Sequence, residues 1–169
     1  MDDVDIPLLL KKETLPDEKL LNRFGANALL PLYRDAGGRG LKPYVLGAST
    51  PRKVLGMLYL TNYRLKFKPI ESIEDAFSLF LPAIAEARDV SRFLVRKCRL
   101  TMQDGTFIEF IRWGIPSLID SVNRARNDAR TLDWHALGRD IASAGPDQLG
   151  AWSVLPDDAQ PTGSTASAG

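Results

Sequence analysis

Residues 56–67, Gly-Met-Leu-Tyr-Leu-Thr-Asn-Tyr-Arg-Leu-Lys-Phe, contain the pattern that decides the fold. Apolar residues alternate with other residues on both sides of the pair Thr61-Asn62. Alternation with a period of two places one face of a strand in a core and the other face in water. Asn tolerates left-handed backbone angles and can bond its own backbone, so the pair suits a turn. The stretch therefore predicts two antiparallel strands, whose core-facing residues are Leu58, Leu60, Leu65 and Phe67.

The other face of this hairpin is basic. Arg64, Lys66 and Lys68 project from the second strand, and Lys53 lies near them across the hairpin. Such a face can bind lipid phosphates, since each Lys or Arg near an anionic membrane contributes up to about 1 kcal/mol. It can equally be a solvated strand face whose lysines prevent edge-to-edge pairing. Both interpretations stay open, and a second basic cluster consists of Arg96, Lys97 and Arg99.

A second hairpin is predicted over residues 96–113. Residues 103–105, Gln-Asp-Gly, suit a three-residue loop with Gly105 in the left-handed conformation. A two-residue Asp-Gly loop would instead set Leu100 against Glu109. Since a slip of one residue moves every side chain to the other face, the three-residue loop is preferred. It pairs Cys98 with Phe110, Arg99 with Glu109, and Leu100 with Ile108.

Two helices are expected after this hairpin. Over about residues 116–132, apolar residues recur at spacings of four, three, four and three, which gives one apolar stripe on a helix. A shorter helix is expected over residues 133–143, with Leu137 and Ile141 buried. The stripe of the first helix comprises Leu118, Val122, Ala125, Ala129 and Leu132.

The first hairpin resembles the signature hairpin of the GRAM domain, a relative of the pleckstrin-homology fold and a family that includes the non-catalytic PH-GRAM domain of myotubularins. The second hairpin also resembles that family, as does the step Leu-Pro-Ala-Ile at residues 81–84. The likeness covers roughly residues 40–130. Ten positions match the signature in order: Gly56, Leu58, Tyr59, Leu60, Thr61, Asn62, Tyr63, Arg64, Leu65 and Phe67.

This resemblance implies a mainly β fold: a pleckstrin-homology-like sandwich or partly open barrel of about seven antiparallel strands, capped by one C-terminal helix. It also implies binding rather than catalysis, so we expect no enzyme and no cofactor. Because Arg64 sits within the signature, the family points equally to a structural salt bridge for it. The residues expected to bind membrane lipid or phosphoinositide are Lys53, Arg64, Lys66 and Lys68.

Composition divides the chain into three expected parts. Residues 1–16 are an N-terminal arm, residues 17–143 are the folded domain, and residues 144–169 are a disordered acidic tail, since the end of the chain lacks large apolar side chains. The net charge of +1 combines an excess of five positive charges over residues 1–130 with an excess of four negative charges over residues 131–169. That positive excess is too small to indicate nucleic acid, but it suits weak attraction to an anionic surface.

The residues available for catalysis or metal binding are few. One cysteine, Cys98, excludes an internal disulfide, and with the single histidine, His135, no Cys/His catalytic pair is expected. The phosphatase motif Cys-x5-Arg is absent, because the sixth residue after Cys98 is Asp104. Cys98 is expected to be a small core residue on a strand. The acidic cluster within the first five residues is expected to be solvated rather than to hold a metal ion.

Two functions are expected as alternatives. The sequence lacks the run of roughly 20 apolar residues that spans a bilayer, and its acidic start does not suit a secretory signal, so a cytoplasmic location is expected, with peripheral contact to a membrane. The first function is docking on anionic lipid through the basic strand face. The alternative is a protein-interaction or oligomerisation module that uses sheet edges and the apolar run Ile6–Leu10 as an added strand.

Overall fold

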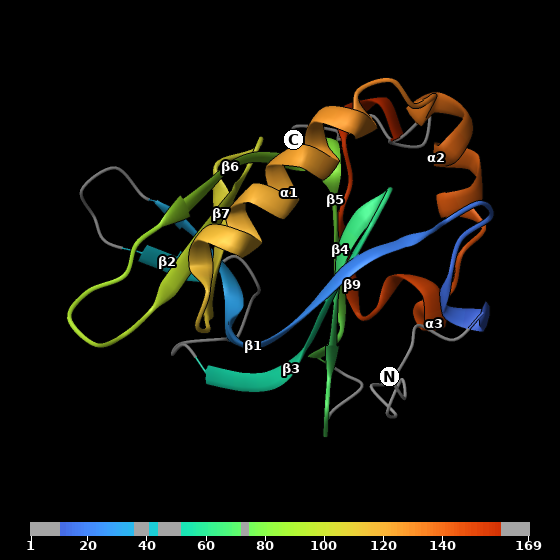
Figure 1. Cartoon of the computed structure of the whole chain (residues 1–169). Helices are drawn as coiled ribbons and strands as arrows, with labels where there is room; N and C mark the ends of the chain where they lie inside the picture. The colour runs from blue at the N-terminus through green and yellow to red at the C-terminus, as the bar shows by residue number, and fades with distance from the viewer. Residues whose placement is uncertain (1–10, 36–40, 44–51, 72–74, 160–169) are drawn as a thin grey trace, which may run out of the picture.

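The computed structural model describes residues 11–35, 41–43, 52–71 and 75–159 (Figure 1). Its nine strands form one sheet in the order β6-β7-β8-β1-β3-β4-β5-β9, with β2 paired to β1. The strands are β1 (Leu20–Asp35), β2 (Leu41–Pro43), β3 (Arg52–Thr61), β4 (Arg64–Pro69), β5 (Phe77–Phe80), β6 (Ile84–Asp89), β7 (Lys97–Met102), β8 (Thr106–Ile111) and β9 (Trp152–Val154). The helices are α1 (Ile115–Ala129), α2 (Trp134–Ala142) and α3 (Pro146–Leu149), with short 3-10 turns η1 (Lys11–Glu13), η3 (Leu81–Ala83) and η4 (Asp157–Ala159).

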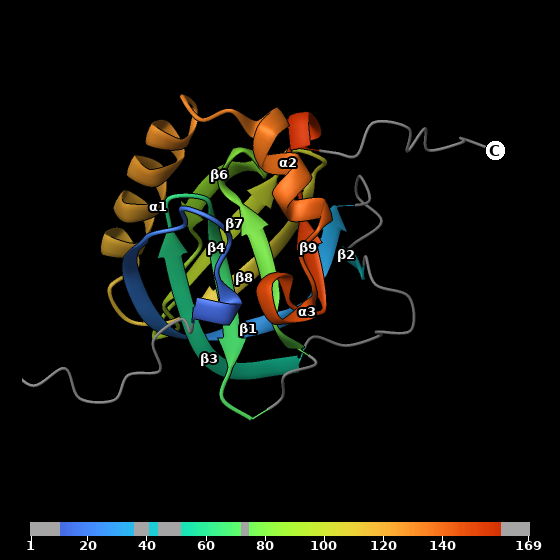
Figure 2. The same cartoon turned by 90° about the vertical axis from the view of Figure 1, so that its right-hand side faces the viewer.

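The long strand β1 joins the two halves of the sheet. It pairs antiparallel with β3 along its first part and with β8 along its later part. The ladder with β8 shifts between Leu29 and Tyr33, around Pro31, which has no backbone N–H to donate to a ladder. Figures 1 and 2 show β1 curving across the molecule from one half to the other.

The signature hairpin forms with the predicted core-facing residues. Leu58 pairs with Phe67 and Leu60 with Leu65, and all four side chains are buried. The turn lies one residue later than predicted, because the hydroxyl of Thr61 accepts hydrogen bonds from the backbone N–H groups of the residues two and three positions on, at 3.1 and 3.0 Å. No side chain fits at Gly56, because a Cβ there would lie 2.6 Å from the ring of Phe67.

The second hairpin is also confirmed. β7 and β8 pair Cys98 with Phe110, Arg99 with Glu109, and Leu100 with Ile108, as predicted. Gly105 has a φ of 85°, the left-handed conformation that the three-residue loop requires. Local turn chemistry and alternation are therefore sufficient to predict both hairpins.

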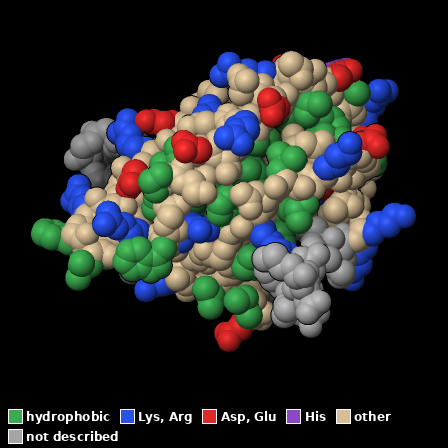
Figure 3. Space-filling model, in the orientation of Figure 1, with side chains coloured by type: hydrophobic (Ala, Val, Ile, Leu, Met, Phe, Trp, Pro, Cys, Tyr) green, Lys and Arg blue, Asp and Glu red, His purple; other side chains and the backbone are tan. Residues whose placement is uncertain are grey.

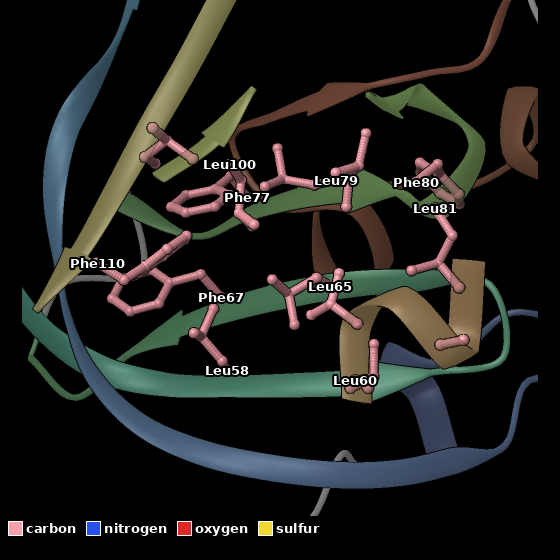
Figure 4. Close-up of a cluster of buried hydrophobic side chains, with 14 of the residues drawn as sticks. Leu58, Leu60, Leu65, Phe67, Phe77, Leu79, Phe80, Leu81, Leu100 and Phe110 are labelled. Atoms are coloured by element: carbon pink, nitrogen blue, oxygen red, sulfur yellow. The ribbon is translucent and has the colours of Figure 1, made fainter. Parts of the chain in front are cut away.

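Side chains from both halves of the sheet meet in one hydrophobic core (Figure 4). The ring of Phe67 stacks on that of Phe77 at a centroid distance of 5.1 Å, and Phe110 packs beside both. Each fully buried Leu or Phe side chain contributes about 1.5–3 kcal/mol through removal of apolar surface from water. The core residues labelled in Figure 4 are Leu58, Leu60, Leu65, Phe67, Phe77, Leu79, Phe80, Leu81, Leu100 and Phe110.

α1 places its predicted apolar stripe against β6 and η3 (Figure 1). The helix ends at Ala129 rather than at the expected Leu132, which lies half-buried beyond it. α2 confirms the second expected helix, with Ile141 buried and Leu137 partly buried. Among the described residues, no helix has the length and apolar character needed to cross a bilayer.

The prediction of a disordered tail from residue 144 is wrong for residues 144–159. β9 pairs in parallel with β5, and the ring of Trp152 stacks on Phe77 at 4.3 Å. Gly150 makes the close approach possible, since it has a φ of 87° and a Cβ there would lie 2.6 Å from the backbone of Ala76. The segment is acidic overall, but it contains a few apolar residues, among them Trp152, that pack against the sheet. Residues 160–169 lie outside the described residues.

The mainly β fold with an open sheet and a C-terminal helical region is confirmed. The count differs from the expectation, because the described chain has nine strands rather than about seven, and α3 follows the two expected helices. The segment expected as an N-terminal arm also differs in its second half. From Lys11 onward it forms η1 and lies against β4 and α3, while residues 1–10 lie outside the described residues.

Candidate functional site

Arg64, predicted to face water and bind lipid phosphate, is instead fully buried. Its Nε and Nη2 atoms donate to the two carboxylate oxygens of Glu18 at 2.8 and 2.9 Å, and neither side chain has exposed surface. Nη1 donates to the hydroxyl of Ser78 at 2.9 Å and to the backbone oxygen of Gln148. Nη2 also donates to the backbone oxygen of Glu13 at 2.8 Å. All five N–H groups therefore have partners, and we call this set the Arg64 network.

The Arg64 network joins three distant parts of the chain. The partners lie in η1 and the segment that follows it, in β5 and in α3 (Figure 2). This segment and α3 cover the face of the hairpin that period-two alternation assigned to water. A buried guanidinium with no free donor has no group left for a lipid phosphate. The structural salt bridge, which the family resemblance offered equally, is the interpretation that the geometry supports.

Lys66 is also buried, with 2% of its surface exposed. Its ammonium donates to the backbone oxygen of Asp147 at 2.8 Å and lies 3.5 Å from that of Glu13. Burial, and secondarily the charge of Arg64, lowers the pKa of Lys66 to about 8. The prediction that Lys66 projects into water is therefore wrong, because residues 11–18 and α3 lie over β4.

The other two predicted residues differ from each other. Lys68 is partly exposed and forms a salt bridge of 2.8 Å with Glu13. Lys53 is exposed near the start of β3, paired in register with Leu29. Thus Lys53 and Lys68 reach solvent, whereas Arg64 and Lys66 do not. The four residues do not form the single exposed basic face that was expected.

The loop between β6 and β7 presents the most exposed large apolar side chains of the described chain. Phe93 is 99% exposed, Leu94 is 90% exposed and Val95 is 47% exposed. Arg92 and Val95 exchange two backbone hydrogen bonds of 3.0 Å, so the two residues between them form a tight turn. We call Phe93, Leu94 and Val95 the hairpin tip.

The backbone at the hairpin tip is unusual for its residue types. Phe93 has a φ of 53°, in the left-handed region that bulky residues rarely adopt, where tight hairpins ordinarily use Gly or Asn. Outliers of this kind cluster at functional sites. In Figure 1 the loop extends beyond the sheet at the lower left, and Figure 3 shows hydrophobic side chains protruding at that end beside Lys and Arg side chains.

Two arginines flank the hairpin tip. Arg92 and Arg96 are exposed, and neither has a carboxylate within salt-bridge distance among the described residues. Hydrogen bonds from Ser91 lower the pKa of the Asp89 carboxyl, and the charge of Arg96 adds to this. The remaining basic side chains near the loop are paired: Arg88 with Glu86 at 2.7 Å, Lys97 with Glu109 at 3.3 Å and Arg99 with Glu109 at 2.9 Å.

Trp113 adds a third kind of side chain to this end of the molecule. It is 76% exposed and follows Arg112, whose backbone N–H donates to the backbone oxygen of Arg96 at 3.1 Å. The guanidinium of Arg112 lies over the ring of Phe24 at 4.7 Å. Hence two exposed aromatic residues gather where β6 and β8 end and β7 begins, together with two arginines that form no salt bridge with the described residues.

Sequence patterns indicated only the basic part of this surface, in the cluster that included Arg96. The signal that could have found the rest is the apolar triplet of the hairpin tip between two arginines, at a place where alternation breaks down. An apolar run at a turn is unexpected in a domain that buries its apolar residues.

The described residues offer little for catalysis. Cys98 is buried in the core, and desolvation raises the pKa of its thiol to about 12, which keeps it in the unreactive thiol form. His135 lies exposed at the start of α2, far in sequence from that cysteine. Within the described ranges, no group of three or more His, Cys, Asp or Glu residues could hold a metal ion.

Comparisons with known proteins leave the family open. No protein-family model matches the chain, and no curated protein matches it. Among solved structures, the C-terminal domain of an unknown protein from Leishmania infantum is similar at 13% sequence identity and a TM-score of 0.46, over 64% of this chain and 84% of that one.

Proposed function

We propose that this protein is a non-catalytic binding module that docks on anionic membrane surfaces through the hairpin tip and its flanking arginines. The observation that carries the proposal is the exposure of Phe93 and Leu94 at the end of a projecting hairpin. The proposal retains the lipid-binding function expected from the sequence, and moves it from the covered face of β4 to the loop between β6 and β7.

The apolar side chains support insertion into a bilayer. Burying a Phe or Leu side chain is worth about 1.5–3 kcal/mol relative to leaving it in water, and the fold buries neither. The tip is convex and narrow, so it can enter the acyl region without requiring a groove on its partner. Trp113 is also exposed and follows Arg112, which is hydrogen-bonded to Arg96 beside the tip. Trp side chains favour the level of the lipid headgroups because the ring is apolar and its N–H is polar.

The charges support a preference for anionic lipid. Arg92 and Arg96 stand on either side of the tip, where inserted apolar side chains would bring them to the headgroup phosphates. Each basic residue near an anionic leaflet contributes about 1 kcal/mol. A protein-interaction module using this same tip is the alternative, and the run Ile6–Leu10 invoked for it in the sequence lies outside the described residues.

We further propose that the chain is a GRAM-like domain. The ten-residue signature forms a central hairpin of the sheet, with its apolar positions in the core. Within this proposal Arg64 and Tyr63 serve the fold rather than a ligand, since both contact the segment after η1.

The test is co-sedimentation of the full chain with vesicles of phosphatidylcholine alone, with added phosphatidylserine, or with added phosphoinositide. We expect pelleting with both anionic compositions, and weaker pelleting as salt rises, because screening shortens to about 8 Å at physiological ionic strength. The double variant Phe93→Ser/Leu94→Ser is expected to lose about tenfold or more in vesicle affinity. Arg92→Glu/Arg96→Glu is expected to lose binding to anionic vesicles.

Matched controls distinguish the tip from general surface properties. Leu55→Ser/Ile70→Ser removes two apolar side chains that are 54% and 64% exposed elsewhere, and Lys53→Glu reverses an exposed charge away from the loop. Both controls should pellet like the native chain. Equal losses in the tip and control variants, or no pelleting with any vesicle, would overturn the proposal and favour a protein partner.

A further inference from the structure

A cavity of about 230 Å³ lies between η1, β4 and α3, beside the Arg64 network. Apolar atoms of Pro69, Ala76 and Pro146 form part of its wall. Three lysines from two different elements also line it: Lys12 from η1, and Lys66 and Lys68 from β4. In Figure 1 this region, around α3, lies at the opposite side of the molecule from the hairpin tip.

Lys66 is a buried cation without a counter-ion among the described residues. Of its three N–H groups, one has a backbone carbonyl at 2.8 Å and one a distant carbonyl at 3.5 Å. No carboxylate oxygen of the described residues lies within 4 Å of the ammonium. Buried charges in proteins are ordinarily paired or bound to an ion of opposite sign. The nearest carboxylate from η1, that of Glu13, is held by Lys68 at 2.8 Å.

The remaining charges at the cavity favour an anion. Three lysines face two carboxylates, Glu13 and Asp147, and one of these carboxylates is already paired. The volume is below the range of about 300–1,000 Å³ that drug-sized ligands occupy, so it suits a small ion or the end group of a larger molecule. An anion in this cavity would complete the third N–H of Lys66 and lie within reach of Lys12 and Lys68.

We infer that this cavity, lined by Lys12, Lys66 and Lys68, is a binding site for a small oxyanion of the phosphate type, either inorganic phosphate or the phosphomonoester end of a headgroup. The inference does not depend on the hairpin tip. An anion there would link η1 to β4, on which the Arg64 network already holds the segment after η1.

The first test is calorimetric titration of the full chain with inorganic phosphate at constant ionic strength, with chloride as the reference anion. We expect saturable binding that Lys66→Met weakens by about tenfold or more. Lys12→Met should weaken it by less, because Lys12 is exposed to water. Lys53→Met, an exposed lysine outside this cavity, should bind like the native chain. Absence of phosphate binding, or equal binding in Lys66→Met, would overturn the inference.

A second readout uses the native chain and does not depend on the folding of any variant. The pKa of Lys66, followed by NMR of its side chain, should rise when phosphate is added, because a bound anion stabilises the charged form. The groups that surround this ammonium are Lys12 and Glu13 from η1, Glu18 from the segment after it, Arg64 and Lys68 from β4, and Asp147 from α3. An unchanged pKa in saturating phosphate would contradict the site.

Vesicles separate the two sources of the phosphate group. If the ligand is a headgroup, the Phe93→Ser/Leu94→Ser variant should bind vesicles that contain phosphatidic acid better than vesicles that contain phosphatidylserine at equal charge. Adding Lys66→Met to that variant should remove the preference. If the ligand is a free ion, calorimetry alone should respond to Lys66→Met. A phosphatidic acid preference that persists in Lys66→Met would overturn the assignment, and failure of the tip variant to bind phosphatidylserine bears only on the proposed function.

Discussion

At the scale of single residues, Arg64 and Glu18 depend on each other. Both side chains are buried, and the fork of the guanidinium contacts both carboxylate oxygens. Removing one partner of such a pair leaves a buried charge without its counter-ion, which costs about 3–5 kcal/mol. Lys is a poor substitute, because its compact ammonium lacks the planar fork.

We expect Arg64→Met to lower the free energy of unfolding by about 3–5 kcal/mol, measured by urea denaturation. The double variant Arg64→Met/Glu18→Gln should cost less than the sum of the two single changes, since it removes both charges together. Lys53→Met on β3 is the matched control and should change stability by no more than about 0.5 kcal/mol. A loss no larger than that of the control would contradict the Arg64 network.

Burial of Lys66 should make the stability of the fold depend on pH. Its pKa is lowered from 10.5 to about 8 in the folded chain, so between these values the unfolded chain holds a proton that the folded chain has released. Stability from this group therefore rises as pH increases from about 8 to about 10.5. Lys66→Met lacks this rise, and below pH 8 it should be the more stable protein.

The measurement is the difference in unfolding free energy between Lys66→Met and the native chain, in buffers without phosphate. The advantage of the variant should shrink by roughly 1–3 kcal/mol between pH 8 and 10.5, at about 1.4 kcal/mol for each unit of pKa difference. Taking the difference cancels the titration of Tyr59 and Tyr63, whose pKa values burial raises. A difference that is independent of pH would show that Lys66 is not desolvated.

At the scale of elements, what could be predicted was local. The hairpins β3–β4 and β7–β8 were both predicted, and the second also with its pairing, because alternation and turn residues lie within about a dozen consecutive positions. The prediction of the lipid-binding residues was wrong for two of them because it, too, used only local patterns. Lys66 and Arg64 were assigned to water from alternation, but residues far away in sequence, near Glu13 and Gln148, cover them.

The hairpin between β6 and β7 is the element with a function to test. Its two turn residues, Phe93 and Leu94, are exposed to water, and Phe93 also has a positive φ that bulky residues rarely adopt, so a partner that buries both side chains would explain their presence at the turn. Replacing them with Asn-Gly should leave the fold intact or stabilise it, because Asn accepts the positive φ of position 93 and neither native side chain is buried. Thermal unfolding checks this, and the same variant should lose vesicle binding. A large fall in stability would instead show that the tip serves the fold.

At the scale of the whole molecule, the C-terminal segment completes the sheet. β9 adds a parallel strand to β5, Trp152 covers Phe77, and α3 supplies two backbone oxygens to β4. Composition could not predict this, because a few apolar side chains in an acidic stretch acquire a partner only when the sheet exists.

A chain that ends at residue 143 should therefore be strongly destabilised, by about 3 kcal/mol or more, since it exposes one face of Phe77 and removes partners from Arg64 and Lys66. A chain that ends at Ala159 retains every described element and is the control. Urea denaturation of both chains against the native one decides this. Equal stability of the two truncated chains would mean that β9 and α3 contribute little.

The Arg64 network also bears on the order of events during synthesis. Arg64 and Gln148 are separated by 84 positions, which a ribosome adding about 5–20 residues per second covers in roughly 4–17 s. Over that interval the guanidinium can already hold Glu18, but the carbonyl from α3 has not yet been made. The nascent chain thus carries a half-satisfied cation until α3 has been synthesised, and the native fold can close only after that helix emerges.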